Sequence, residues 1–203
     1  MLKRTAIEAN SLVLTFDEGP SDRFTNEILN FFNKYEVKAT FFLLGKMVES
    51  RQDIARQIAQ GGHEICSHGY DHINYLKVSP WRAIADIKRG WKTIDAALGQ
   101  KLEKYPFRPP YGKLNIICLL YLLIKRVPIV YWTFDCGDTW KIKPSCHIIK
   151  EAVKKGGAVT LAHGCDRYDG TNEFVLDSIQ SALVVAKDKG MQILTVSELL
   201  DSN

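Results

Sequence analysis

The feature that most constrains the fold of this chain is a regular alternation of short apolar runs with longer amphipathic stretches. The short runs are rich in β-branched and aromatic residues and end at Gly, Pro or Asp, as buried strands do. They cover residues 12–16, 39–44, 64–66, 105–107, 129–134, 158–161 and 192–194. The intervening stretches have helical periodicity and cover residues 24–35, 53–60, 80–98, 114–124, 145–155, 173–189 and 196–200.

Seven alternating strand–helix units predict an α/β fold, with parallel strands inside and helices outside. A distorted (β/α)7 barrel is the natural closed form of such a chain. No linker, repeat or low-complexity segment interrupts the 203 residues, so we expect a single domain over residues 1–203. In barrels of this kind the functional site lies at the carboxyl ends of the strands.

Composition excludes several functional classes. The net charge is only +4, without a basic tract, which argues against a nucleic-acid partner. The most apolar stretch, residues 114–132, contains Lys125, Arg126 and Pro128, and we therefore expect no membrane span. Five scattered cysteines without a C-x-x-C pair and the lack of a signal-like start favour reduced thiols and a cytoplasmic location. The sequence predicts no particular oligomeric state.

Two motifs carry the typical donors of a metal site. In S67-H-G-Y-D-H72, His68 and His72 are four residues apart, so one helical turn could aim both imidazoles at one ion. In L14-T-F-D-E-G-P20, Asp17 and Glu18 follow a predicted buried strand. Beside a metal, one carboxylate can bind the ion while the other accepts a proton from water. Alone, each motif has an ordinary structural explanation, and we interpret His63 and His147 in that way.

Three further segments supply polar groups after later strands. In F107-R-P-P-Y-G112 two prolines fix the backbone, so Arg108 could pair with a carboxylate and keep it ionised. The backbone N–H of Tyr111 could then stabilise an oxyanion. Asp135 and Asp138 follow the fifth predicted strand, and His163 follows the sixth. A histidine beside an aspartate is typical of a general acid.

These five segments, in this order from Leu14 to His163, resemble the polysaccharide deacetylase family, the NodB-homology domain of carbohydrate esterase family 4. The resemblance implies a distorted (β/α)7 barrel and hydrolysis of N-acetyl groups on an N-acetylated carbohydrate. It also implies one divalent metal, zinc in most members, with cobalt, nickel or manganese as alternatives. By motif position the metal ligands are Glu18, His68 and His72.

The same resemblance assigns roles to the remaining positions. Asp17 is the expected general base, and Arg108 orients it. Tyr111 is the expected oxyanion donor, and Asp138 tunes His163 as the acid. The residues expected to bind substrate, around the acetyl methyl group, are Leu161, Trp140 and Pro110.

Two departures from the family pattern stand out. The family motif reads T-F-D-D-G-P, but here the second acid is Glu18. One extra methylene displaces an extended carboxylate by about 1.5 Å, more than a metal–ligand distance tolerates, although glutamate is itself a good zinc ligand. Thr139 separates Asp138 from Trp140, which alters the acyl pocket. Three alternatives therefore stay open: a deformylase, an O-acetyl esterase, and a non-catalytic carbohydrate-binding protein with a degenerate metal site.

Overall fold

The centre of the molecule is a parallel β-sheet. A computed structural model describes residues 10–99, 101–102, 104–140, 153, 157–166 and 170–202. Its strands are β1 (Ser11–Val13), β2 (Thr15–Asp17), β3 (Thr40–Leu43), β4 (Glu64–Ser67), β5 (Phe134–Asp135), β6 (Ala158–His163) and β7 (Gln192–Leu194). The order is β4-β3-β2-β6-β1-β7, with β5 beside β6, and every pairing is parallel.

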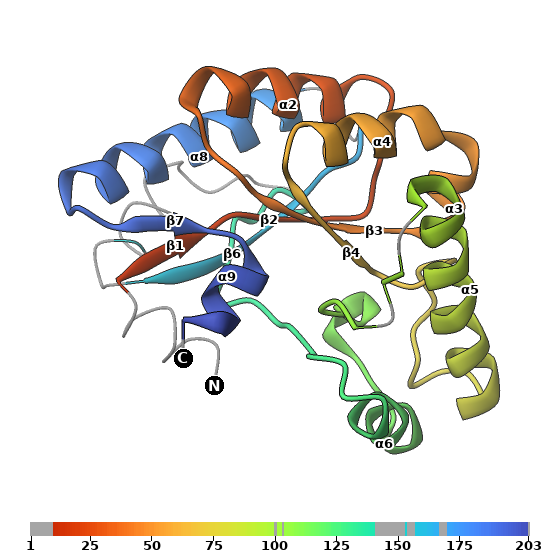
Figure 1. Cartoon of the computed structure of the whole chain (residues 1–203). Coiled ribbons are helices and arrows are strands. Elements are labelled where there is room, and N and C mark those ends of the chain that lie inside the picture. The colour runs from red at the N-terminus through yellow and green to blue at the C-terminus, as the bar shows by residue number, and fades with distance from the viewer. Residues whose placement is uncertain are drawn as a thin grey trace.

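Helices cover the outside of this sheet. They are α2 (Phe24–Tyr35), α3 (Gly45–Ser50), α4 (Gln52–Gln60), α5 (Pro80–Leu98), α6 (Ile116–Ile124), α8 (Thr171–Asp188) and α9 (Val196–Asp201), with a 3-10 turn η1 at Pro110–Gly112. Figure 1 shows α2, α4 and α8 covering one side of the strands and α3 and α5 covering an adjacent side. Helix α6 lies farthest from the sheet. Among the described residues, none of these helices has the length and apolar character needed to cross a bilayer.

The barrel is closed by isolated bridges where full strands are expected. Beyond β4, Ser67 pairs with Phe107 and Phe107 pairs with Ile129. The chain then reaches β5, which returns to β6 through Phe134–Thr160 and Asp135–Leu161. This uneven closure matches the predicted distorted α/β barrel.

Most predicted elements are confirmed. The helices at 24–35 and 80–98 have the predicted bounds, and those at 53–60, 114–124, 173–189 and 196–200 differ by one or two residues at an end. Helix α5 begins with a cap, because the Ser79 side chain accepts a hydrogen bond from the Arg82 N–H and Pro80 occupies the first turn. The helix predicted at 145–155 lies outside the described residues, apart from Val153.

The strand predictions at 105–107 and 129–134 are wrong over most of their length. In the first segment Pro106 has no N–H to donate to a strand ladder. In the second, the Val130 and Thr133 N–H groups still donate to the carbonyl oxygens of Phe107 and Val159, both at 2.9 Å. The strand predicted at 12–16 is divided into β1 and β2. At the division, the Thr15 N–H donates to the Thr160 hydroxyl at 3.4 Å, so a side chain interrupts the backbone ladder.

Helix α3 was not predicted. Its first residue is Gly45, and no side chain caps it. Its first two N–H groups instead donate to the carbonyl oxygens of Gly69, at 2.9 Å, and Tyr70, at 3.1 Å. The helix is therefore stabilised by a loop distant in sequence, which local periodicity cannot indicate.

Candidate active site

A cavity of about 750 Å³ opens at the carboxyl ends of the strands, where barrel geometry predicts it. Its wall brings together residues that follow β2, β4, β5 and β6, so the predicted convergence of distant segments is confirmed. The sequence-predicted residues that line it are Asp17, Glu18, His68, His72, Tyr111, Asp135, Leu161 and His163.

A buried ion pair lies beneath the cavity. Asp17 ends β2, and its Oδ1 accepts a hydrogen bond from Nη1 of Arg108 at 2.5 Å. Nη1 also donates to the Thr15 hydroxyl at 2.7 Å, while the guanidinium lies 4.1 Å from the centre of the Phe42 ring. Both charged side chains are almost completely buried. Arg108 therefore holds the Asp17 carboxylate in one orientation.

His68 presents one nitrogen to the cavity. Its Nδ1 lies 2.7 Å from the carbonyl oxygen of Arg108. A carbonyl oxygen can only accept, so Nδ1 carries the hydrogen and Nε2 of the neutral ring has a lone pair. Nε2 lies 3.6 Å from Oδ2 of Asp17. Burial lowers the pKa of His68 to about 4, although the Asp17 carboxylate opposes this shift.

Glu18 reaches two neighbours on the cavity wall. Its Oε1 lies 3.8 Å from Nε2 of His72. Its Oε2 accepts a hydrogen bond from the thiol of Cys165 at 2.9 Å. Cys165 lines the cavity but was not predicted from the sequence, since a cysteine two residues after His163 matches no motif.

The donor set fits a divalent metal in its chemistry. His68 has the hydrogen-bonded second nitrogen typical of a metal ligand, and the two His–carboxylate pairs are 3.6 and 3.8 Å apart. When one ion lies about 2.1 Å from each of two ligand atoms, those two atoms are separated by roughly 3.5 Å. As they stand, no three described His, Cys, Asp or Glu side chains lie close enough together to hold an ion.

Three residues of the cavity wall have a left-handed backbone. Glu18, His72 and Tyr111 have φ angles of 65°, 56° and 59°. Such angles cost energy in residues other than glycine and persist where surrounding structure enforces them, often at functional sites. The Tyr111 ring also packs on His72, with 4.5 Å between ring centres. The wall is thus built from residues held in unusual conformations.

Asp138 holds His163 at the end of β6. Its Oδ2 accepts from the His163 backbone N–H at 2.8 Å, and its Oδ1 lies 2.9 Å from the ring Nδ1. Asp138 is buried, whereas His163 lines the cavity. Because a carboxylate accepts hydrogen bonds, Nδ1 carries a hydrogen and the ring is fixed for proton exchange at Nε2.

The predicted acyl-pocket residues are not all brought together. Leu161 lines the cavity, but Pro110 and Trp140 are not among the lining residues. Trp140 is 53% exposed. Thr139 and Trp132 stand on the wall instead. Trp132 thus supplies the aromatic side chain of the wall that was expected from Trp140.

A buried aspartate on α5 positions the histidine loop and was also not predicted. Asp86 accepts hydrogen bonds from the N–H groups of Tyr70 and Asp71, both at 3.0 Å, and from the Tyr75 hydroxyl at 2.8 Å. These bonds attach the segment between His68 and His72 to α5. A single aspartate inside a long amphipathic helix has no local signature in the sequence.

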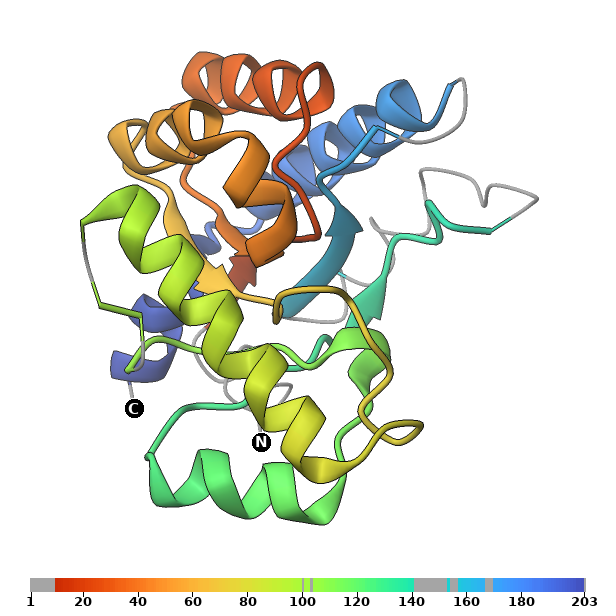
Figure 2. The ribbon, with the colours of Figure 1, turned by 90° about the vertical axis from the view of Figure 1, so that its right-hand side faces the viewer.

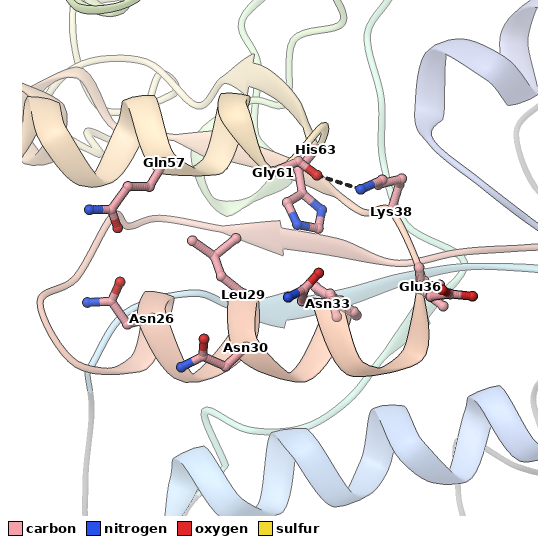
Figure 3. A pocket seen from close by; sticks show the side chains of 11 residues that line it. Asn26, Leu29, Asn30, Asn33, Glu36, Lys38, Gln57, Gly61 and His63 are labelled. Atoms are coloured by element: carbon pink, nitrogen blue, oxygen red, sulfur yellow. Dashed lines mark hydrogen bonds between the residues drawn. The ribbon is translucent and has the colours of Figure 1, made fainter.

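A second hollow lies outside the sheet, between two of the covering helices. It has a volume of about 530 Å³ and lies between α2 and α4, with Asn26, Asn30, Asn33 and Gln57 on its rim (Figure 3). Figure 3 shows the His63 ring pointing from the end of α4 toward α2. Nδ1 of His63 accepts the Ala39 N–H at 3.2 Å. The interpretation of His63 as a structural histidine is thus confirmed.

Comparison with known proteins finds relatives that match most of this chain. The sequence profile named Polysaccharide deacetylase matches residues 5–121. The uncharacterized protein YlxY of Bacillus subtilis is 31% identical over 89% of this chain, and the chain spans 54% of that relative's length. A peptidoglycan-N-acetylglucosamine deacetylase of Bacillus cereus is 30% identical, with 95% of this chain and 69% of the relative covered.

A solved structure shows the same fold. The Bc1960 peptidoglycan N-acetylglucosamine deacetylase, crystallised in complex with 4-naphthalen-1-yl-N-oxidanyl-benzamide, superposes with a TM-score of 0.85 at 30% sequence identity. The alignment covers 95% of this chain and 89% of that chain.

Proposed function

The chain belongs to the polysaccharide deacetylase family, and from this premise we propose that it hydrolyses the N-acetyl group of an N-acetylated amino sugar. The observation that carries the proposal is the meeting, in one cavity, of a buried Asp17–Arg108 pair and an Asp138-bound His163. Such a pair of oriented proton-transfer groups is what amide hydrolysis requires, because water must lose a proton and the leaving amine must gain one.

Deacetylases of this family depend on a metal. We propose that Glu18, His68 and His72 would hold it, and that it is zinc, which accepts imidazole nitrogen and carboxylate oxygen together. When bound, a zinc ion supplies Lewis acidity toward the acetyl carbonyl and the attacking water.

Different residues of the chain carry out the two proton transfers. The Asp17 carboxylate, oriented by Arg108, accepts a proton from the water whose oxygen attacks the amide carbon. The backbone N–H of Tyr111 donates to the oxygen that becomes negative. His163 donates a proton to the sugar nitrogen as the C–N bond breaks, which leaves acetate and a free amine. Asp138 keeps the His163 ring in the orientation that this donation needs.

We propose an amino sugar of the peptidoglycan type as the substrate class. The support is that relatives named peptidoglycan-N-acetylglucosamine deacetylase match 93–95% of this chain. The cytoplasmic location expected from the cysteines stays a prediction, and it favours a small or membrane-carried substrate over a finished wall polymer.

Acetate release by the purified, metal-loaded protein tests the proposed activity. The substrates are N-acetylglucosamine oligomers and peptidoglycan fragments, with an N-formyl sugar and acetylated xylan as competing substrates. Asp17→Asn should lower kcat by a factor of about 100 or more, because the base is lost. Asp22→Asn is the matched control, since Asp22 is an exposed aspartate five residues away that pairs with Arg51.

The possible outcomes are distinct. Acetate release that Asp17→Asn abolishes and Asp22→Asn preserves supports the proposal. Release of formate or of ester-bound acetate alone would identify a deformylase or an O-acetyl esterase. Glycan binding without turnover or stoichiometric metal, measured by elemental analysis, would identify a binding protein.

A further inference from the structure

Helix α6 is apolar on all of its faces yet lies at the surface. Its sequence, IICLLYLLI, contains no charged residue. Helices that are apolar all round are normally enclosed on every side. Here only Cys118 and Leu122 are fully buried. The packing of Trp91 of α5 against Tyr121, at 6.4 Å between ring centres, shows that α5 covers this buried side.

The opposite side of α6 forms one apolar face. At 100° per residue its members occupy a continuous arc facing away from Cys118 and Leu122. They are Ile116, Ile117, Leu120, Leu123 and Ile124, with exposed fractions from 40% to 81%. Figures 1 and 2 both show α6 at the lower edge of the molecule, with no other helix beyond it.

The start of α5 extends this face. Nδ2 of Asn115, the residue that caps α6, donates to the Tyr75 carbonyl oxygen at 2.8 Å. The Cys118 thiol lies 3.8 Å from the Pro80 carbonyl oxygen. The residues next to these two contacts are also apolar and exposed: Leu76 at 59% and Trp81 at 74%. An exposed apolar patch of this kind marks an interaction surface.

Positive charge surrounds the apolar face. Residues 76–126 contain eleven of the 27 lysines and arginines of the chain but only three of its 23 acidic residues. Of the eleven, Arg108 is buried against Asp17 and Arg89 lies near Glu49, which leaves nine for the surface. Lys113 and Lys125 are exposed near the two ends of α6, and Arg82 is exposed beside Trp81. Nζ of Lys88 lies 5.6 Å from the centre of the Tyr121 ring. Of the acids, Asp86 is buried and bonded to the histidine loop.

We propose that the apolar face of α6 and its basic surroundings bind the surface of a lipid bilayer that contains anionic lipid. An interfacial helix inserts apolar side chains at the headgroup boundary, while lysines and arginines around it attract anionic headgroups. A second copy of the chain fits less well, because a symmetric contact through α6 would bring two basic rims together.

This surface adjoins the mouth of the candidate active site. Tyr111 and Lys113 line the cavity, and α6 begins three residues after Lys113. A molecule docked through α6 would therefore hold the cavity mouth close to the bilayer. If the proposed deacetylase function is correct, this arrangement suits an N-acetylated sugar carried on a lipid. The docking itself does not depend on catalysis.

Vesicle co-sedimentation tests the proposal with the full chain and no substrate. We expect binding to vesicles of phosphatidylcholine with about one third phosphatidylglycerol, weaker binding to pure phosphatidylcholine, and loss of binding at high salt. Leu120→Ser/Ile124→Ser should lower partitioning by about tenfold or more. Val184→Ser, at an apolar position of α8 that is 49% exposed, should not change it.

A charge-reversed variant provides a second test of membrane binding in case the serine variant does not fold. Arg82→Glu/Lys125→Glu should lower binding to anionic vesicles by about tenfold or more while binding to neutral vesicles changes little. Lys34→Glu/Lys187→Glu, on α2 and α8, is the matched control.

Three results would overturn the proposal. One is no binding of the wild-type chain to either vesicle. Another is equal binding by the α6 variants and their controls. The third is a wild-type dimer in sedimentation velocity that Leu120→Ser/Ile124→Ser dissociates, without vesicle binding by either protein, which would assign the face to self-association. Because no step measures acetate release, failure here leaves the deacetylase proposal intact.

Discussion

At the residue scale, the Glu18 carboxylate reaches two neighbours on the cavity wall. The carboxylate of Glu18 lies 3.8 Å from His72 and 2.9 Å from the Cys165 thiol, and its φ of 65° sets the direction of the side chain. A shorter acid at this position would have to reach the same neighbours with one methylene less. We therefore propose that the site is built around glutamate, although the family motif has aspartate here.

We predict that Glu18→Asp weakens zinc binding by about tenfold, because the carboxylate retreats by about 1.5 Å from His72. Isothermal titration of the metal-free protein with zinc measures the change. Cys165→Ser is the control, since it keeps the carboxylate and a hydrogen-bond donor beside it, and its affinity should change by less than about threefold. Tighter zinc binding by Glu18→Asp would contradict this interpretation and make Glu18 a drifted ligand.

His63 makes the stability of the fold depend on pH. Burial, reinforced by the positive charge of Lys38, lowers the pKa of His63 from 6.5 to about 4. The unfolded chain therefore binds a proton between pH 6.5 and pH 4 that the folded chain does not. Stability from this group is present above pH 6.5 and is lost as the pH falls toward 4, by at most about 3 kcal/mol.

Urea unfolding at pH 7 and at pH 4.5 measures this loss. In His63→Asn the side-chain oxygen occupies the place of Nδ1 and can still accept the Ala39 N–H, but it does not titrate. We predict that the free energy of unfolding of this variant falls less between the two pH values than that of the wild type. An equal fall in both proteins would assign the acid sensitivity to other groups.

At the scale of elements, α5 supports the loop that carries the two histidines. Besides the three hydrogen bonds to Asp86, the helix approaches the loop at a pair of glycines. A Cβ on Gly90 would lie 2.6 Å from the backbone carbonyl carbon of Gly69, so neither position has room for a side chain. Contact and hydrogen bonds together fix the loop relative to the helix.

We predict that Asp86→Ala lowers the free energy of unfolding by about 2–4 kcal/mol, because two backbone N–H groups and a hydroxyl lose their acceptor. It should also weaken zinc binding by about tenfold without removing a ligand. Asp95→Ala is the matched control on the same helix. Oδ1 of Asp95 accepts the Leu102 N–H at 2.7 Å, away from the histidine loop. The control should lose stability but keep its zinc affinity; parallel loss of affinity in both variants would refute a local role for Asp86.

Elements with their own local signals were predictable from the sequence. Helix α5 has apolar periodicity, a Ser-Pro start and a glycine stop, and its bounds were predicted correctly. Helix α3 depends on partners distant in sequence, so local patterns could not reveal it. The strands predicted at 105–107 and 129–134 had local signals, but outside Phe134 of β5 their pairing is reduced to the bridges at Phe107 and Ile129.

The residues of the candidate site also divide into those that the sequence predicted and those that it did not. The convergence of Asp17, His68 and His163 followed from the rule that parallel strands end at one rim. The contributions of Asp86 and Cys165 depend on how loops pack after folding, and neither residue lies in a recognisable motif.

At the scale of the whole molecule, the strands divide the core into two connected parts. Leu12 and Leu14 pack outward against the helices, whereas Val13 between them points into the barrel. Val196 and Leu199 of α9 belong to the inner part. Helix α9 thus fills the inner core near the start of β4, where the Glu64 carboxylate accepts the Val196 N–H at 2.9 Å.

Because the same strands contribute to both parts of the core, we predict that the chain unfolds as one cooperative unit, as expected for a single domain. Leu199→Ala, which removes a fully buried side chain from the inner core, should lower the free energy of unfolding by about 2–5 kcal/mol. Urea unfolding followed by far-UV circular dichroism and by tryptophan fluorescence should give coincident transitions in both proteins. Leu76→Ala, at a position that is 59% exposed, is the matched control and should change stability by less than about 0.5 kcal/mol. If Leu199→Ala separates the two transitions, the inner core and the helical layer unfold independently, and the single-domain prediction is wrong.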